Sequence, residues 1–352
     1  MTSPRPAAFA LPGDIATLTG GYIYDRRLVE ALRAQGRAVR VIQLPDSFPT
    51  PDDRDMDAAL DQLAALPPDL PVIIDGLAFG ALDSRGLARV RAPIVALIHH
   101  PLAQESALPA GLADHLWRTE RANLALARHV MVPSPHTRDM LIQRYDVPED
   151  RITVVRPGTD RPICRTPATP GQPPLILSVG ILHPRKGHDI LIAALARLRD
   201  LDWQGVIVGT PWDRGHAAEL QAQVGALEIG NRLRLAGQVP GEALQELYQR
   251  ASIFVLATRY EGYGIVFDEA LSHGLPIVST RAGAVPGTVP PDAGILVAPD
   301  DPQALATALR GLLTDPQARA AKAAAAARAG ALLPGWEEAA RLASAVLEGL
   351  AP

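Results

Sequence analysis

The chain has 352 residues, of which 47% are hydrophobic, so it is long enough to form two domains with sizeable cores. Its formal net charge of −4 argues against nucleic acid or an acidic polymer as a partner. A single cysteine, Cys164, excludes an internal disulfide framework and fits a reducing compartment.

Short apolar runs alternate with amphipathic segments along the whole chain, a pattern typical of β-α-β units and parallel sheets. In the first half we predict strands near Ala7–Leu11, Ala38–Leu44, Pro71–Asp75, Ile94–His99, His129–Pro133 and Ile152–Val155. Helices are predicted near Tyr22–Gln35, Met56–Ala65, Gly111–Ala127 and Pro135–Arg144.

A proline-rich stretch follows and predicts a stiff linker over residues 161–174. The second half repeats the pattern, with strands predicted near Leu175–Val179, Gly205–Val208, Leu233–Ala236, Ser252–Ala257, Pro276–Ser279 and Ile295–Val297. Helices are predicted near Gly187–Arg199, Gly215–Leu227, Glu242–Gln249, Gly264–His273, Pro302–Leu313 and Gln317–Leu347, the last broken at Pro334-Gly335. The fold class is therefore α/β with two doubly wound domains facing a cleft. One large sheet with insertions is the alternative.

Two carboxylates stand eight positions apart where an apolar run meets a helical pattern. Glu261 is predicted on a loop at the carboxyl end of a strand, and Glu269 inside the following helix, which begins after Gly264. Ligands of open α/β sheets bind at that edge, and a helix N-terminus attracts phosphate. A diphosphate there would leave Glu261 facing a sugar and Glu269 facing a ribose. The alternative is a pair of solvent-facing acids. Arg259, just before, could pin the loop or reach a phosphate.

Arg185 and Lys186 follow the first strand of the second half, in a loop between a glycine and a helix. Together these cations suit a diphosphate leaving group, and a basic pair on a solvated loop is the alternative. The chain has two lysines, and Lys322, in an alanine-rich helix, is predicted to be a surface charge.

Gly20 and Gly21 follow the first strand and precede the first helix. Two glycines there allow close approach of a ligand and offer N–H groups at a helix start, although a plain tight turn is the alternative. The pattern is not G-x-G-x-x-G, so dinucleotide binding is not indicated.

His99 and His100 end the fourth strand of the first half, and His99 is the better placed to contact a sugar hydroxyl. A structural role is the alternative. A zinc site built from His99, His100, His129 and His136 is disfavoured because their spacing matches no known ligand set and thiolates are absent.

As a set, these motifs resemble the family-4 retaining glycosyltransferases of GT-B architecture. The E-x7-E element of that family matches Glu261 and Glu269, and its VG…KG.D.LI element matches Val179-Gly180, Lys186-Gly187, Asp189 and Leu191-Ile192. The glycine-rich first loop matches Gly20 and Gly21, and the strand-end histidine matches His99, for which His100 competes. Val132-Pro-Ser134 and Arg156-Pro-Gly158 resemble two further landmarks, so the resemblance covers nearly the whole chain.

The resemblance implies an acceptor domain over residues 1–160 and a nucleotide-sugar donor domain over 175–335. A last helix, 336–352, would pack back on the first domain with Trp336 as a packing anchor. Glu269 would hold the ribose, Arg185 and Lys186 the diphosphate, and Glu261 the donor sugar. His99, Gly20 and Gly21 would stand nearer the transferred sugar and the acceptor. The remaining implied donor-binding residues are Gly180, Gly262, Tyr263, Gly264, Ile265 and Val266.

The implied reaction is transfer of a sugar from a UDP-, GDP- or ADP-sugar, with retention, to a hydroxyl of a glycan, a lipid-linked or a small acceptor. No metal and no cofactor would be needed. Two departures from the family pattern are Ile181-Leu182 in place of Arg-Leu after Gly180, where Arg185 would supply the guanidinium, and the absence of an acid in Val285–Gly287. They keep two alternatives open: a catalytically silent nucleotide-sugar-binding protein and a GT-B-fold sugar-nucleotide epimerase.

We expect a cytoplasmic protein, because no signal peptide and no apolar stretch of about 20 residues is evident. Residues 1–165 hold 19 arginines against 20 acids, which gives no overall basic surface. Peripheral contact with a membrane and the oligomeric state stay open.

Overall fold

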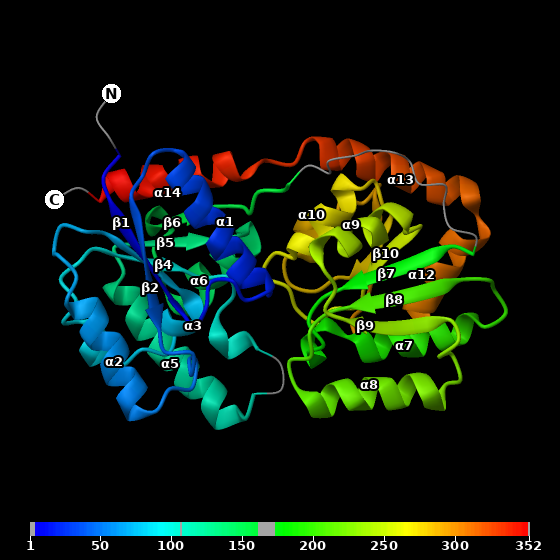
Figure 1. Ribbon diagram of the computed structural model, residues 1–352, viewed down its shortest axis with the longest axis horizontal. Coiled ribbons are helices and arrows are strands. Elements are labelled where there is room, and N and C mark those ends of the chain that lie inside the picture. The colour runs from blue at the N-terminus through cyan, green and yellow to red at the C-terminus, as the bar shows by residue number, and fades with distance from the viewer. Residues whose placement is uncertain (1–3, 106–107, 161–172, 351–352) are drawn as a thin grey trace. The chain divides into compact units, whose positions relative to one another are not determined.

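The computed structural model describes residues 4–105, 108–160 and 173–350 (Figure 1). Contacts divide the chain into two compact units, Met1–Gly158 with Pro334–Pro352 (unit 1) and Thr159–Leu333 (unit 2). Each unit contains one six-stranded parallel sheet with flanking helices, which confirms the predicted two-domain α/β fold. Most of the predicted linker, residues 161–172 with Cys164, lies outside the described residues.

Unit 1 is built on a sheet whose strands follow the order β2-β1-β3-β4-β5-β6. The strands are β1 (Ala7–Pro12), β2 (Val39–Leu44), β3 (Val72–Asp75), β4 (Ile94–Leu97), β5 (His129–Val132) and β6 (Ile152–Val154). The chain places β2 on one side of β1 and then β3 on the other side, so the strand order reverses between β1 and β3. Ligands of open α/β sheets bind beside such a reversal, at the carboxyl ends of the strands.

The helices of unit 1 include two that sequence periodicity missed. They are α1 (Gly20–Ala34), α2 (Asp53–Ala64), α3 (Gly76–Phe79), α4 (Ser84–Leu87), α5 (Ala110–Leu126), α6 (Pro135–Tyr145) and α14 (Trp336–Gly349), with 3-10 turns η1 (Leu102–Gln104) and η2 (Glu149–Arg151). The missed helices, α3 and α4, have four residues each, too few to display a helical period.

The last helix, α14, lies beside α1 in unit 1 (Figure 1). Trp336 is 7% exposed, and its ring meets the Tyr24 ring edge-on at 5.6 Å, as expected of a packing anchor. Gln35 donates a hydrogen bond from Nε2 to the Glu337 carbonyl at 2.9 Å. A Cβ at position 158 would come within 2.2 Å of the Trp336 nitrogen, so only glycine allows the chain to pass here.

Unit 2 is built on a sheet of order β12-β11-β10-β7-β8-β9. The strands are β7 (Leu175–Val179), β8 (Gln204–Val208), β9 (Leu233–Gly237), β10 (Ile253–Leu256), β11 (Ile277–Thr280) and β12 (Gly294–Val297). After β9 the chain returns to the free side of β7, so β7 and β10 are neighbours and the order reverses between them. The segments that follow these two strands therefore start side by side.

Helices cover both faces of this sheet (Figure 1). They are α7 (His188–Leu195), α8 (Arg214–Ala226), α9 (Gly241–Arg250), α10 (Ile265–Ser272), α11 (Val285–Thr288), α12 (Pro302–Thr314) and α13 (Pro316–Ala331), with 3-10 turns η3 (Pro184–Lys186) and η4 (Ala196–Leu198). One core cluster contains residues of α7, α8 and α12, and the other contains residues of α9, α10 and α13. Strands buried on both faces must be apolar throughout, which explains the continuous apolar runs in the sequence.

The predicted helix Gly187–Arg199 is divided in the structure into α7 and η4. The break predicted at Pro334-Gly335 is confirmed, because α13 ends at Ala331 and α14 begins at Trp336. No helix among the described residues is long and apolar enough to cross a bilayer.

Candidate functional site

Lys186, Arg185 and Glu261 form a largely buried charged cluster beside the strand reversal of unit 2. Lys186 and Arg185 lie in η3, after β7, and Glu261 lies in the loop after β10. Lys186 Nζ is 2.6 Å from Glu261 Oε1, and the Arg185 guanidinium is 3.7 Å from Glu261 Oε2. Thr258 donates a hydrogen bond from Oγ1 to Glu261 Oε1 at 3.0 Å. Three residues singled out from the sequence are thus brought into contact across 75 positions.

The two cations keep the Glu261 carboxyl ionised although it is 4% exposed. Burial alone would raise the pKa of Glu261, but the charges of Lys186 and Arg185 and the hydrogen bonds it accepts outweigh burial and lower the pKa. Two cations and one carboxylate leave a formal charge of +1. The cluster can therefore attract an anion while the carboxylate remains an acceptor for a hydroxyl.

Two glycines hold this cluster against the end of the sheet. Gly187 has a φ of +64°, and a Cβ there would come within 1.9 Å of the Ala257 carbonyl oxygen. Gly283 has a φ of +55°, and a Cβ there would come within 2.2 Å of the Glu261 carbonyl oxygen, which accepts a hydrogen bond from the Ala284 nitrogen at 2.8 Å. Both positions need glycine because the backbone approaches too closely for any side chain.

Arg259 pins the loop, the first of its two predicted roles. Its guanidinium makes two hydrogen bonds to the Asp189 carboxylate, at 3.0 and 2.7 Å, and one to Asp300 at 2.7 Å. Its backbone nitrogen donates to the Arg185 carbonyl at 2.7 Å. These contacts tie the loop of Glu261 to the turn that carries Arg185 and Lys186.

Glu269 is the fifth residue of α10 and is half-buried. Tyr248 of α9 donates a hydrogen bond from its hydroxyl to Glu269 Oε2 at 2.6 Å. Burial raises the pKa of Glu269, the nearby Asp160 adds to the rise, and the Tyr248 hydrogen bond opposes it. Oε1 has no hydrogen-bond partner among the described residues and so can accept from a ligand hydroxyl. Sequence reasoning missed Tyr248, which lies in α9, outside the E-x7-E segment.

The other predicted donor-binding residues lie around the same edge. Gly180 directly follows β7, and its missing Cβ would touch Lys186 Cδ at 3.4 Å. Tyr263 uses its hydroxyl internally, donating to Asp268 Oδ2 at 2.6 Å. Gly264 caps α10 with a φ of +88°, and Ile265 and Val266 are the first two residues of that helix. Gly262 lies in the loop between Glu261 and Tyr263 and is buried.

In unit 1, Gly20 and Gly21 are the first two residues of α1, whereas the sequence predicted them in a loop before the helix. Their N–H groups therefore lie in the first turn of the helix. His99 lies two residues beyond β4, which ends at Leu97 rather than at His99 as predicted. A Cβ at position 21 would come within 3.3 Å of His99 Cδ2, so the absence of a side chain lets the imidazole lie against α1.

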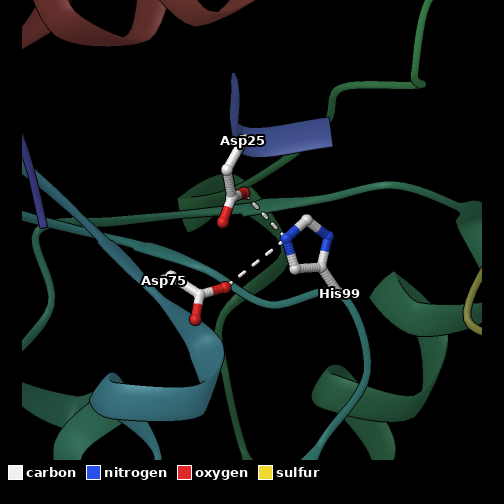
Figure 2. A group of neighbouring side chains, drawn as sticks. All are labelled: Asp25, Asp75 and His99. Carbon is white, nitrogen blue, oxygen red and sulfur yellow. Dashed lines mark hydrogen bonds and ion pairs between the residues drawn. The ribbon is translucent and has the colours of Figure 1, made fainter. Parts of the chain in front are cut away.

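His99 contacts two buried carboxylates that the sequence did not single out (Figure 2). Its Nε2 is 2.9 Å from Asp25 Oδ1 and 3.5 Å from Asp75 Oδ2. One ligand atom from each of these residues lies within 4.8 Å of the others, so the group could hold a metal ion. The other histidines considered from the sequence as zinc ligands do not belong to this group. His129 is hydrogen-bonded to Thr153 at 2.8 Å, and His100 lies 3.5 Å from Glu105.

Lys322 lies in the alanine-rich helix α13 and is partly exposed, which agrees with the predicted surface charge. Its ammonium lies near three backbone carbonyls, those of Pro291, Asp292 and Gly294, at 3.0 to 3.5 Å, so it binds the end of a loop rather than only solvent. The negative ends of the carbonyl dipoles attract the ammonium. The alanine-rich sequence of the helix does not reveal this contact, because the carbonyls belong to a distant loop.

Comparisons with known proteins identify the family. Residues 20–161 match the model described as Glycosyltransferase Family 4, and residues 163–329 match Glycosyl transferases group 1. D-inositol 3-phosphate glycosyltransferase 1 of Catenulispora acidiphila is 32% identical over 66% of this chain and 59% of its own length. The corresponding protein of Corynebacterium efficiens is 32% identical over 51% of this chain and 46% of its own length. The matches thus span about half the length of these curated relatives.

Solved structures show the same fold. A sucrose-phosphate synthase from Thermosynechococcus elongatus superposes with a TM-score of 0.79 at 22% identity, covering 98% of this chain and 99% of that one. Anabaena HepE in complex with UDP-glucose gives 0.78 at 17% identity, covering 97% and 100%. The two family models together cover most of the chain, and both units carry the parallel sheets of the GT-B fold. The chain belongs to the family-4 glycosyltransferases of GT-B architecture.

Proposed function

We propose that this protein is a retaining glycosyltransferase that moves a sugar from a nucleotide-diphosphate sugar to a hydroxyl acceptor without a metal ion. The observation that carries the proposal is the Lys186–Arg185–Glu261 cluster beside the junction of β7 and β10. An anion-attracting group of this kind, next to the start of α10, suits a diphosphate.

The two glutamates would hold the two ends of such a donor. Glu269, with Oε2 fixed by Tyr248, presents Oε1 to the ribose hydroxyls. Glu261 faces the transferred sugar. The solved relative HepE, named above, contains UDP-glucose, which supports trying uridine donors first.

In the proposed reaction the bond between the sugar's anomeric carbon and the diphosphate breaks while a bond to the acceptor oxygen forms on the same face. The acceptor proton passes to an oxygen of the departing phosphate. Lys186 and Arg185 stabilise the negative charge that develops on the leaving group, which is the task a metal ion performs in other transferases. The acceptor hydroxyl belongs to a glycan, a lipid-linked sugar or a small molecule.

The test begins with binding and then follows turnover. Thermal shift with UDP, GDP and ADP selects the base, and proton NMR follows the matching nucleotide sugars with and without acceptor candidates. We expect slow hydrolysis or transfer with an unchanged anomeric configuration, at equal rates in EDTA and in magnesium. Inversion of the anomeric centre, or a rate that collapses in EDTA, contradicts the corresponding part of the proposal. Binding without turnover would point to a silent sugar-nucleotide-binding protein, and epimerised donor without acceptor to an epimerase.

A further inference from the structure

The Asp25–Asp75–His99 group is a feature of unit 1 for which the proposed function gives no reason. Asp25 comes from α1, Asp75 ends β3 and His99 follows β4, so the group lies beside the strand reversal of its own sheet. Asp25 is 1% exposed and Asp75 2% exposed, whereas the His99 side chain is 19% exposed. Two buried acids therefore stand behind one histidine that reaches the surface.

The ring of His99 is held in one orientation. Its Cδ2 edge lies against Gly21, where a Cβ would be only 3.3 Å away. Tyr24 meets the ring edge-on, with centroids 5.0 Å apart, and is itself anchored by a hydrogen bond from its hydroxyl to the Val155 carbonyl at 2.8 Å. Asp75 is also fixed, because its Oδ1 accepts from the Leu77 nitrogen at 3.0 Å as the cap of α3.

Both contacts to the carboxylates use the same ring nitrogen. Figure 2 shows Nε2 facing Asp25 and Asp75, with Nδ1 on the opposite side of the ring. Among the described residues nothing hydrogen-bonds Nδ1. A hydrogen bond made by one ring nitrogen sets what the other can do. A proton on Nε2, directed at Asp25, leaves Nδ1 as the atom presented outward.

The charges around the ring favour its protonated form. Burial alone would lower the pKa of His99, but the charge and hydrogen bond of Asp25, aided by Asp75, outweigh burial and raise it. Burial, with the charge of Asp25, raises the pKa of Asp75 to about 7. The neighbouring Tyr22 and Tyr24 have raised pKa values, chiefly through burial, so both hydroxyls stay neutral. The other ionisable groups in contact with the imidazole are the carboxyl groups of Asp25 and Asp75.

We propose that Asp25, supported by Asp75, is a positioning residue that fixes the Nε2 proton of His99 and presents Nδ1 to a hydroxyl oxygen of a bound substrate. This rests on the proposed function, in which the substrates carry hydroxyl groups. In the charged ring Nδ1–H donates to that oxygen, and loss of the proton turns Nδ1 into an acceptor. The carboxylates thereby decide which hydrogen bond His99 offers.

The first test reads the ring directly and needs no turnover. The nine histidines are labelled with 15N, the His99 signals are assigned by their absence in His99→Gln, and a pH series is recorded on the unliganded protein. We expect the neutral ring of the wild-type protein to carry its proton on Nε2. In Asp25→Asn, whose amide oxygen can still accept that proton, deprotonation moves to lower pH. Asp57→Asn, at an exposed site of α2, leaves the titration unchanged.

A wild-type neutral ring protonated on Nδ1, or an Asp25→Asn titration equal to that of the wild type, overturns the proposal. So does a change of the His99 signals on adding zinc or manganese at low concentration, since the group would then be a metal site. Because these readings do not depend on activity, they separate failure of the positioning role from failure of the proposed function.

The second test is kinetic. Removing a hydrogen bond to a charged group costs a factor of about ten to a hundred in an equilibrium constant. We expect a loss of that size in kcat/KM for Asp25→Ala. In Asp25→Asn the fall in kcat/KM on the alkaline side shifts to lower pH, an effect that a merely structural aspartate would not produce. An unshifted pH profile with reduced activity overturns the positioning role.

Discussion

Replacing Lys186 with methionine tests the cluster on which the proposed function rests. Methionine keeps the length of the side chain but removes the ammonium that lies 2.6 Å from Glu261 Oε1. Glu261 would then remain buried with Thr258 and the more distant Arg185 as partners. Removing one partner of a buried ion pair costs about 3–5 kcal/mol, and because Arg185 remains we expect about 3 kcal/mol.

Two measurements follow from that magnitude. For a domain of 150–250 residues each kcal/mol shifts Tm by about 2–4 °C, so calorimetry should show a drop of roughly 6–12 °C in the transition of unit 2. Turnover with the best nucleotide sugar should fall about 100-fold to 1,000-fold, because a preorganised charge on a leaving group is worth about 3–4 kcal/mol. UDP affinity measured by titration calorimetry should fall in the same variant.

A double variant separates stability from function. In Lys186→Met with Glu261→Gln the buried charge is gone as well, so Tm should recover much of the loss while turnover stays low. Lys322→Met is the matched control, since it removes the second lysine of the chain, which contacts backbone carbonyls instead of a carboxylate. The reasoning is refuted if Lys186→Met melts within about 2 °C of the wild type, which corresponds to about 0.5–1 kcal/mol, and turns over within a few-fold of it.

Three further outcomes are expected. Tyr248→Phe removes the donor to Glu269 and should weaken UDP binding about tenfold by calorimetry, and an affinity within twofold would contradict a role in placing that carboxylate. Gly187→Ala should lower both Tm and UDP affinity because of the contact with the Ala257 carbonyl, whereas Gly311→Ala, in open space on α12, should raise Tm slightly. Burial raises the pKa of Glu120 to about 8, so its stabilising contribution is complete below its ordinary value of 4.5 and is lost as pH rises through about 8. Urea unfolding of Glu120→Gln at several pH values should show a free energy of unfolding that falls less with rising pH, by on the order of a few kcal/mol. A pH dependence equal to that of the wild type would show that Glu120 does not cause the fall.

The sequence by itself determined the strands, the α/β class and the family, because strands buried on both faces must be apolar and the E-x7-E spacing stays within one strand-loop-helix segment. It also marked Lys186 and Glu261 separately, each at the end of its own strand. Local periodicity does not encode which strands become neighbours, so it did not reveal that β7 and β10 lie side by side and pair these two residues across 75 positions.

The same reason explains what was missed in unit 1. Asp25 and Asp75 belong to no motif, and each is unremarkable in its own segment, yet the adjacency of β1, β3 and β4 brings both to His99. Arg259 could be assigned to its pinning role only once Asp189 and Asp300 were seen beside it. Local pattern fixed where the reactive side chains stand along the chain, and the order of strands in each sheet decided which of them meet.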